Sequence, residues 1–235
     1  MGGPAAKAHW LAQGNPTWQA LNMKQITFWF DPISPFAYLA FVRLPQVLQG
    51  CSFDVRYRPV VFGALLKHHA HKGPAEIEPK RAWTFRHTHW LAAQHGITMD
   101  TPLRHPFNSL ALQRLTLACS APGGTPNRHV VQKVLEHVWQ GGADANEPAR
   151  LTALQEHLAP KRDAGGEEVK AELRDHTDAA LKCGVFGVPS FELEGRVLWG
   201  LDSLEMLRGA LMGEAWFDGP AWQREGEPRE GVVRR

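Results

Sequence analysis

Two stretches far apart in the chain carry the residues that could do chemistry. In the first, Ser34 follows an apolar run, residues 26–30, and stands directly before Pro35. Serine before proline is typical of a helix start, because the hydroxyl accepts a backbone hydrogen bond and proline gives up only an N–H without an intrahelical partner. The positive end of such a helix suits an anion or a thiolate. Ser34 is therefore either a plain helix cap or a hydroxyl placed at an anion-binding terminus.

The second stretch, residues 184–191, places a Val188-Pro189 bond directly before another apolar run. Proline is tolerated at the first residue of a strand, and X-Pro is the one peptide bond whose cis form costs little. An early strand-to-helix turn together with a late Val-Pro bond resembles the thioredoxin superfamily, in which the first position is a nucleophilic cysteine and the proline is cis. Here Ser34 and Ala37 replace both cysteines of Cys-x-x-Cys. A disulfide oxidoreductase is therefore not expected.

The elements that must position these stretches follow from periodicity. The run 26–30 predicts a buried strand, and the alternation over 53–58 predicts a half-buried one parallel to it. Helical stripes fill most of residues 65–182, while 191–193 and 196–199 flank a hairpin turn. Asp202, three residues before Glu205, resembles the capping box of a last helix, and Pro45 is expected to kink or end the first helix.

These elements predict an α/β fold with a thioredoxin-like domain and a large all-helical insertion, the architecture of a DsbA-like protein. We assign residues 23–64 and 183–216 to the thioredoxin-like domain and 65–182 to the insertion. Residues 1–22 are expected to be a flexible extension, and residues 217–235 a tail.

Composition narrows the class of partner. With 26 basic and 24 acidic residues and a net charge of +2, the chain shows no nucleic-acid footprint. No apolar stretch long enough for a signal peptide or a membrane span is present, so no membrane partner is expected. The three cysteines are odd in number and widely spaced, which argues against a disulfide framework and favours a reducing, cytoplasmic compartment. The histidines match no zinc spacing, so no metal is predicted.

The motifs also resemble a narrower family. The chain looks like a 2-hydroxychromene-2-carboxylate isomerase, which is kin to kappa-class glutathione transferases, from residue 23 to residue 216. The matching residues are Asp31-x-x-Ser34-Pro35-Phe36-x-Tyr38-Leu39, Arg58-Pro59, Gly63, Pro106-Phe107-Asn108-Ser109, Val185-Phe186-Gly187-Val188-Pro189 and Trp199-Gly200-x-Asp202-x-Leu204.

This resemblance implies a glutathione site. Ser34 would donate its hydroxyl to the glutathione sulfur, and Val188 and the cis Pro189 would hold the tripeptide as a strand would. Asp202 or the backbone of Leu201 would meet the γ-glutamyl end, although Asp202 could instead be a cap without a ligand.

The resemblance also implies three peripheral contacts. Lys80 would contact the glycine carboxylate, or it could belong to a solvated basic face. Phe36 and Asn108 would face the second substrate, and Asn108 could equally cap the helix that follows it. His71 and Leu201 depart from the residues that many relatives have at these positions, which leaves the peripheral contacts open.

By this resemblance the expected function is a glutathione-dependent isomerase acting on 2-hydroxychromene-2-carboxylate or trans-o-hydroxybenzylidenepyruvate in aromatic degradation. Glutathione would be the cofactor, a small aromatic compound the substrate, and a homodimer the assembly. A kappa-class-like glutathione transferase or peroxidase is the alternative, and a non-catalytic thioredoxin-like binding module is the third.

Overall fold

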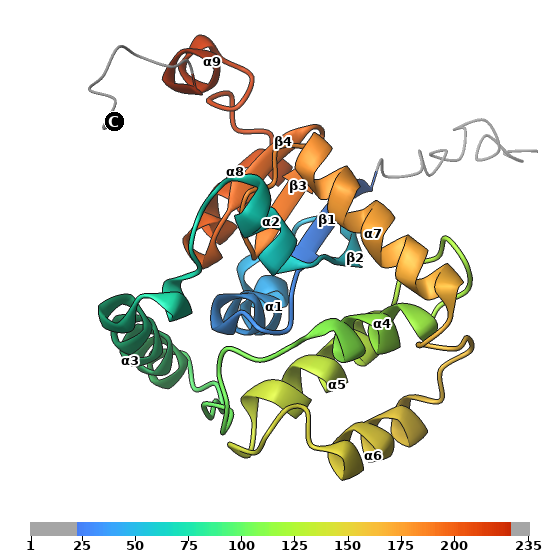
Figure 1. Cartoon of the computed structure of the whole chain (residues 1–235). Coiled ribbons are helices and arrows are strands. Elements are labelled where there is room, and N and C mark those ends of the chain that lie inside the picture. Colours follow the sequence, from blue (N-terminus) through green and yellow to red (C-terminus); the bar gives the residue numbers. More distant parts are fainter. Residues whose placement is uncertain (1–22, 227–235) are drawn as a thin grey trace, which may run out of the picture.

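The computed structural model describes residues 23–226. The predicted extension, 1–22, and the end of the predicted tail, 227–235, lie outside the described residues. Figure 1 shows the elements in chain order, which are β1 (Lys24–Phe30), α1 (Pro35–Val47), β2 (Phe53–Pro59), α2 (Phe62–His68), the 3₁₀ turn η1 (Pro74–Glu76), α3 (Glu78–Gln94), α4 (Leu110–Ala118), α5 (Arg128–Trp139), α6 (Pro148–Leu158), α7 (Glu167–Lys182), β3 (Ser190–Leu193), β4 (Arg196–Trp199), the 3₁₀ turn η2 (Leu201–Ser203), α8 (Leu204–Leu211) and α9 (Pro220–Gly226).

The sheet has four strands in the order β2-β1-β3-β4. As predicted, β1 and β2 run parallel, whereas β1 with β3 and β3 with β4 run antiparallel. Glu194 and Gly195, with φ of 52° and 78°, form the two-residue turn between β3 and β4. Positive φ at both central residues is what such a hairpin turn requires.

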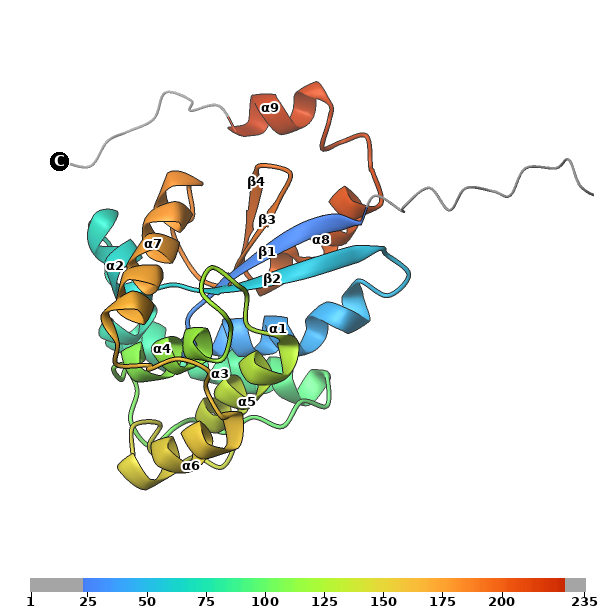
Figure 2. The same ribbon diagram turned by 90° about the vertical axis from the view of Figure 1, so that its right-hand side faces the viewer.

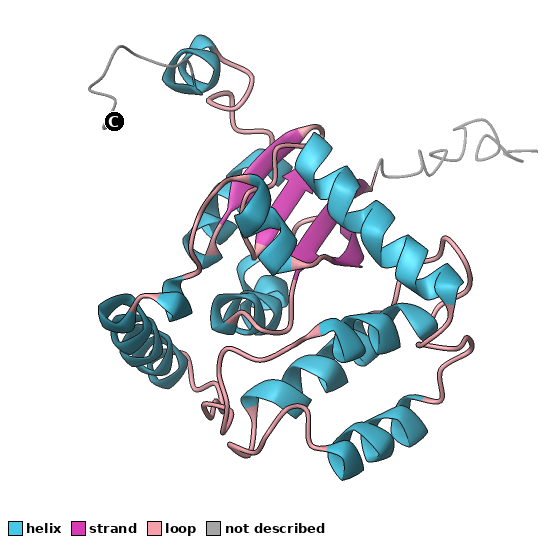
Figure 3. Cartoon of the chain, in the orientation of Figure 1, coloured by secondary structure: helices cyan, strands magenta, loops and turns pink. Residues whose placement is uncertain are grey.

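The central strand β1 is buried on both faces, which explains why its sequence is a continuous apolar run. Phe28 and Phe30 belong to the main core with residues of α1 and α8. Trp29 points to the other face, where it packs with Leu65 of α2 and Ala180 of α7. The sheet is therefore a middle layer between two helical layers, as Figure 3 also shows.

The helices α3 to α6 follow one another between β2 and α7, and α7 leads back to β3. In both views α4, α5 and α6 lie on the same side of the sheet as α1 (Figures 1 and 2). The helical insertion and the α/β architecture agree with the predicted fold class, while the domain boundaries at residues 64 and 183 stay a prediction.

Three local predictions need correction. Asp202 is not a helix cap, because it lies inside η2, and α8 begins after Ser203, whose side chain makes no capping hydrogen bond. Of the two alternatives for Pro45, an early end of the helix is wrong, because α1 continues to Val47, and a kink stays a prediction. In the segment expected to be a tail, Phe217 is only 5% exposed and packs in the main core, and α9 follows it.

Within residues 23–226, no helix is long and apolar enough to cross a membrane.

Candidate active site

Ser34 lies where the two distant stretches of the sequence meet. Its Oγ accepts a hydrogen bond from Ala37 N at 3.2 Å, so it caps α1 as predicted. The same hydroxyl donates to the carbonyl oxygen of Val188 at 3.3 Å. The cap and the contact across 154 residues are therefore made by one side chain, and the hydroxyl is more than a local cap.

The Val188-Pro189 bond is cis. A backbone hydrogen bond from the loop after β4 holds Pro189 in place. Gly200 N donates to Pro189 O at 2.9 Å, which ties the start of η2 to this proline. Within the described part of the chain, the Val188 N–H makes no hydrogen bond. Among the described residues, the Val188 N–H is thus free, and the Val188 carbonyl accepts only from the Ser34 hydroxyl. An extended peptide that pairs with this segment as an extra strand would use this N–H and this carbonyl.

A glycine and an indole shape the outer side of this segment. A Cβ at Gly187 would lie 2.6 Å from Trp199 Nε1, so any larger residue would displace that ring. Trp199 also contacts Phe186, with ring centroids 5.0 Å apart, and both side chains are about half exposed. The result is an exposed aromatic pair beside Val188 and Pro189.

Asp31 is a buried carboxylate three residues before Ser34, and sequence reasoning gave it no role beyond a motif match. Its two oxygens accept hydrogen bonds from Ile33 N and Phe62 N, each at 3.0 Å. Burial raises the pKa of Asp31 to about 6, and the two backbone N–H groups partly offset this shift. Asp31 therefore holds the turn before α1 to the start of α2.

Two further groups that sequence reasoning missed hold the same turn from the insertion. His105 Nε2 lies 2.9 Å from Ile33 O, and Trp139 Nε1 donates to Pro32 O at 2.9 Å. Burial lowers the pKa of His105, which favours a neutral ring whose Nε2–H donates to the Ile33 carbonyl. The carbonyls of the turn are thereby satisfied by residues about 70 to 107 positions later.

The structure brings some of the other predicted residues to this place and leaves others apart. Leu201 is buried and Asp202 is exposed, and both lie in η2, directly after Gly200, whose N–H donates to Pro189 O. Phe36 contacts His87 of α3, with ring centroids 5.8 Å apart. The exposed Lys80 lies in the first turn of α3, and no hydrogen bond within residues 23–226 ties it to the residues around Ser34. Asn108 Oδ1 accepts from Leu110 N at 3.0 Å in the turn before α4, whereas the N-cap of α4 is Ser109, whose side chain makes no capping hydrogen bond.

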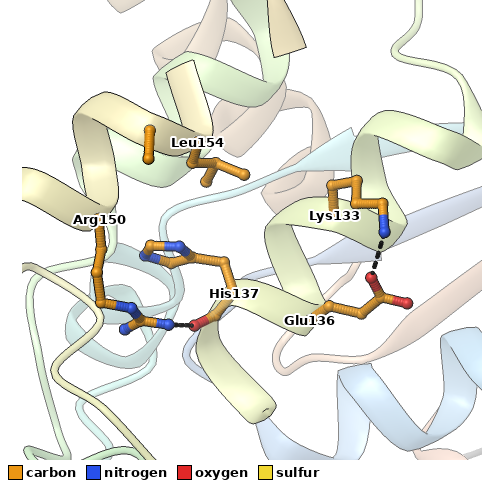
Figure 4. Close-up of a pocket in the computed structure, with 6 residues that line it drawn as sticks. Lys133, Glu136, His137, Arg150 and Leu154 are labelled. Carbon is orange, nitrogen blue, oxygen red and sulfur yellow. Dashed lines mark hydrogen bonds and ion pairs between the residues drawn. The ribbon is translucent and has the colours of Figure 1, made fainter. Parts of the chain in front are cut away.

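A hollow of about 400 Å³ between α5 and α6 contains none of the predicted site residues (Figure 4). Its charged groups already have partners, because Lys133 pairs with Glu136 at 2.9 Å and Arg150 donates to His137 O at 2.6 Å. Among the described residues, no group of three or more His, Cys, Asp or Glu side chains is placed to hold a metal ion. The groups that the structure brings together around Ser34 are its hydroxyl, the N-terminus of α1 and the Val188 backbone.

Known proteins resemble this arrangement over most of the chain. The sequence model of the family described as DSBA-like thioredoxin domain matches residues 25–212. A 2-hydroxychromene-2-carboxylate isomerase of Sphingobium xenophagum is 28% identical over 196 residues, which cover 80% of this chain and 98% of that protein. Glutathione S-transferase kappa 1 of Rattus norvegicus is 25% identical over 211 residues, 82% of this chain and 92% of that protein.

Solved structures show the same fold. A 2-hydroxychromene-2-carboxylate isomerase superposes with a TM-score of 0.71 at 24% identity, over 83% of this chain and 97% of that one. A probable DsbA oxidoreductase from Streptomyces coelicolor superposes with a TM-score of 0.56 at 20% identity, over 81% and 91% of the two chains. At these identities the structures support the architecture and leave the reaction to be argued from the site.

Proposed function

Because the chain belongs to the DSBA-like thioredoxin domain family, we propose that it is a glutathione-dependent isomerase of the 2-hydroxychromene-2-carboxylate type, with glutathione bound as a thiolate at Ser34. The observation that carries the proposal is the Ser34 hydroxyl, which caps α1 and reaches the carbonyl next to the cis proline. The isomerase and kappa-class relatives support a glutathione-related enzyme. Ser34 and Ala37 stand where the cysteines of a disulfide oxidoreductase would be.

The proposed binding mode uses the backbone N–H and the carbonyl of Val188. The cysteinyl unit of glutathione would lie antiparallel to Val188, giving its N–H to the Val188 carbonyl and accepting the Val188 N–H. Ser34 has one hydroxyl proton, so it cannot donate to this carbonyl and to sulfur at the same time. When glutathione takes the carbonyl, the hydroxyl is released and can donate to the thiolate, which the positive end of α1 also stabilises.

The remaining predicted contacts complete the proposal. The γ-glutamyl end would meet Asp202 or the backbone of Leu201, next to Pro189. Lys80 would approach the glycine carboxylate, and Phe36 and Asn108 would face the aromatic substrate. We also propose the homodimer that the resemblance implies and the cytoplasmic location that the three widely spaced cysteines favour.

The proposed reaction is covalent and returns its nucleophile. The thiolate would add to the conjugated carbon of the benzylidenepyruvate, forming a C–S bond while the π electrons move to the carbonyl oxygen. Rotation about the carbon–carbon bond that was the double bond follows, and return of the electrons from the enolate oxygen then re-forms that double bond in the isomer as the C–S bond breaks and the thiolate leaves. Such catalysis divides one hard step into two easier ones, and no thiol is consumed.

The test is turnover with less glutathione than substrate. The enzyme is mixed with trans-o-hydroxybenzylidenepyruvate and substoichiometric glutathione, and both the isomer and the thiol titre are followed. Many turnovers at constant thiol are expected. Loss of one thiol per product would instead assign a transferase, the alternative that the kappa-class relative supports. A reaction independent of glutathione would contradict both assignments, and no glutathione binding at all would favour the binding module.

A further inference from the structure

Helix α3 carries an aromatic face that the proposed catalytic groups do not account for. We define this face as Trp83, His87 and Trp90, which recur at helical spacing. The His87 ring lies nearly parallel to both indoles, with centroid distances of 5.9 Å to Trp83 and 6.5 Å to Trp90. The two indoles are 65% and 58% exposed. Three roughly aligned rings are therefore presented to solvent.

This aromatic face lies beside the start of α1. The Phe36 ring meets His87 edge-on, with centroids 5.8 Å apart and an interplanar angle of 66°. Phe36 is two residues beyond Ser34, in the first turn of the same helix. A ligand on the aromatic face would therefore lie on the side of α1 from which Phe36 projects.

The aromatic face lines a hollow whose side chains are aromatic or basic. Trp83, Arg86, His87 and Trp90 line a hollow of about 570 Å³, and none of these side chains is acidic. Indole rings stack on planar aromatic groups, while a guanidinium pairs with a carboxylate. Lys80 adds a second cation near the same face, one helical turn before Trp83. Such a surface complements a planar aromatic anion.

We propose that the aromatic face of α3 binds the aromatic ring of a carboxylate-bearing second substrate, with Arg86 facing the carboxylate. This inference rests on the proposed function, because the electrophile must come within reach of a thiolate at Ser34. A macromolecular partner fits the face less well. At about 250 Å² for a whole tryptophan, the exposed parts of the two indoles offer about 300 Å², below the roughly 800 Å² that each partner buries in a stable interface.

The experiment measures binding of trans-2-hydroxycinnamate by calorimetry, both in the presence and in the absence of excess S-methylglutathione, and measures glutathione affinity separately. The doubly substituted variant Trp83→Ala/Trp90→Ala is expected to weaken this binding by about 10- to 100-fold, because it removes both stacking surfaces. Arg86→Gln is expected to weaken it by about 10-fold. The matched control is Trp216→Ala, which removes another exposed indole and is expected to leave binding unchanged. Circular dichroism and unfolding midpoints confirm that each variant folds.

The possible outcomes separate this inference from the proposed function. Weaker cinnamate binding with unchanged glutathione affinity supports the inference. Unchanged cinnamate binding in the double variant overturns it, and so does a wild-type dimer that the double variant converts to monomer, because the face would then join two copies. If the wild type binds cinnamate through these indoles but does not bind glutathione, the ligand face stands and the proposed function fails.

Discussion

At the scale of single residues, the hydroxyl of Ser34 joins a local role to a distant one. As a cap it satisfies Ala37 N, which is a property of the sequence around it. As a donor to Val188 O it depends on the fold, because Val188 is brought there from the far end of the chain. A hydroxyl can accept at the cap and still donate elsewhere, so stabilising α1 does not prevent Ser34 from meeting a ligand.

Asp31 permits a prediction about pH. Its pKa is raised in the folded protein to about 6, from 3.8, so the folded state holds this proton more tightly than the unfolded chain does. The resulting stability is fully present below about pH 4 and is lost as the pH rises through about 6, with an amplitude of about 3 kcal/mol. In Asp31→Asn the side chain does not titrate. The free energy of unfolding of the wild type minus that of the variant should therefore fall across this window.

Urea unfolding of both proteins at pH 4, 5, 6 and 7 gives the measurement. Asp54→Asn, at an exposed position on β2, is the control and should track the wild type at every pH. The amide cannot accept from both Ile33 N and Phe62 N, so Asp31→Asn also carries a loss that does not vary with pH. If the free energies of unfolding of the wild type and of Asp31→Asn differ by the same amount at every pH from 4 to 7, the raised pKa of Asp31 is contradicted.

At the scale of elements, local chemistry predicted most of the helices and strands. Ser34 before Pro35 and the hairpin turn at Glu194-Gly195 both act on neighbouring backbone, so their effects can be read from adjacent residues. Asp202 shows the limit of this approach. Its spacing to Glu205 fits a capping box, yet Gly200, with φ of 99°, starts a 3₁₀ turn that places Asp202 inside it.

The contacts that hold the candidate site could not be predicted in this way. His105 and Trp139 reach the carbonyls of the turn before α1 from loop and helix positions far along the chain. Neither residue belongs to a pattern that signals such a contact, because the contact follows from how the insertion packs on the domain. The exposed aromatic face of α3 was missed for a related reason, since the same helix also carries the inward-facing Phe85 and Leu91.

The close approach of the 184–190 segment to β4 leads to a prediction at this scale. In Gly187→Ala the new Cβ would lie 2.6 Å from Trp199 Nε1, so the indole must move outward. Overpacking of this kind costs about 1–3 kcal/mol, and we expect the low end because Trp199 is 53% exposed. Glutathione affinity should fall several-fold because the displaced ring borders Val188 and Pro189.

Chemical denaturation and calorimetry measure the two effects. Gly63→Ala is the matched control, because a Cβ at Gly63, within α2, meets nothing within 4 Å. It should leave glutathione affinity unchanged and could raise stability by up to about 1 kcal/mol. Equal behaviour of the two variants would mean that the contact between Gly187 and Trp199 does not shape the site.

At the scale of the whole molecule, the site exists only when three parts of the chain assemble. The start of α1 brings the hydroxyl, the segment before β3 brings the free Val188 backbone, and the insertion holds the turn and adds the aromatic face of α3. None of these parts alone contains both the hydroxyl and the Val188 backbone. The central claim is therefore that their assembly lowers the pKa of bound glutathione.

That claim is tested most directly by the ultraviolet absorbance of the glutathione thiolate, followed against pH in the complex. A free thiol titrates at about 8.5, and we expect bound glutathione to titrate below about 7.5, since a helix terminus and a hydroxyl donor both favour the thiolate. Ser34→Thr, which keeps a hydroxyl, should preserve this value, as should the surface control Ser52→Ala. Ser34→Ala should return the pKa toward 8.5 and slow isomerisation about 10- to 1000-fold. Bound glutathione that titrates at 8.5 in the wild type, or identically in Ser34→Ala, would contradict the account.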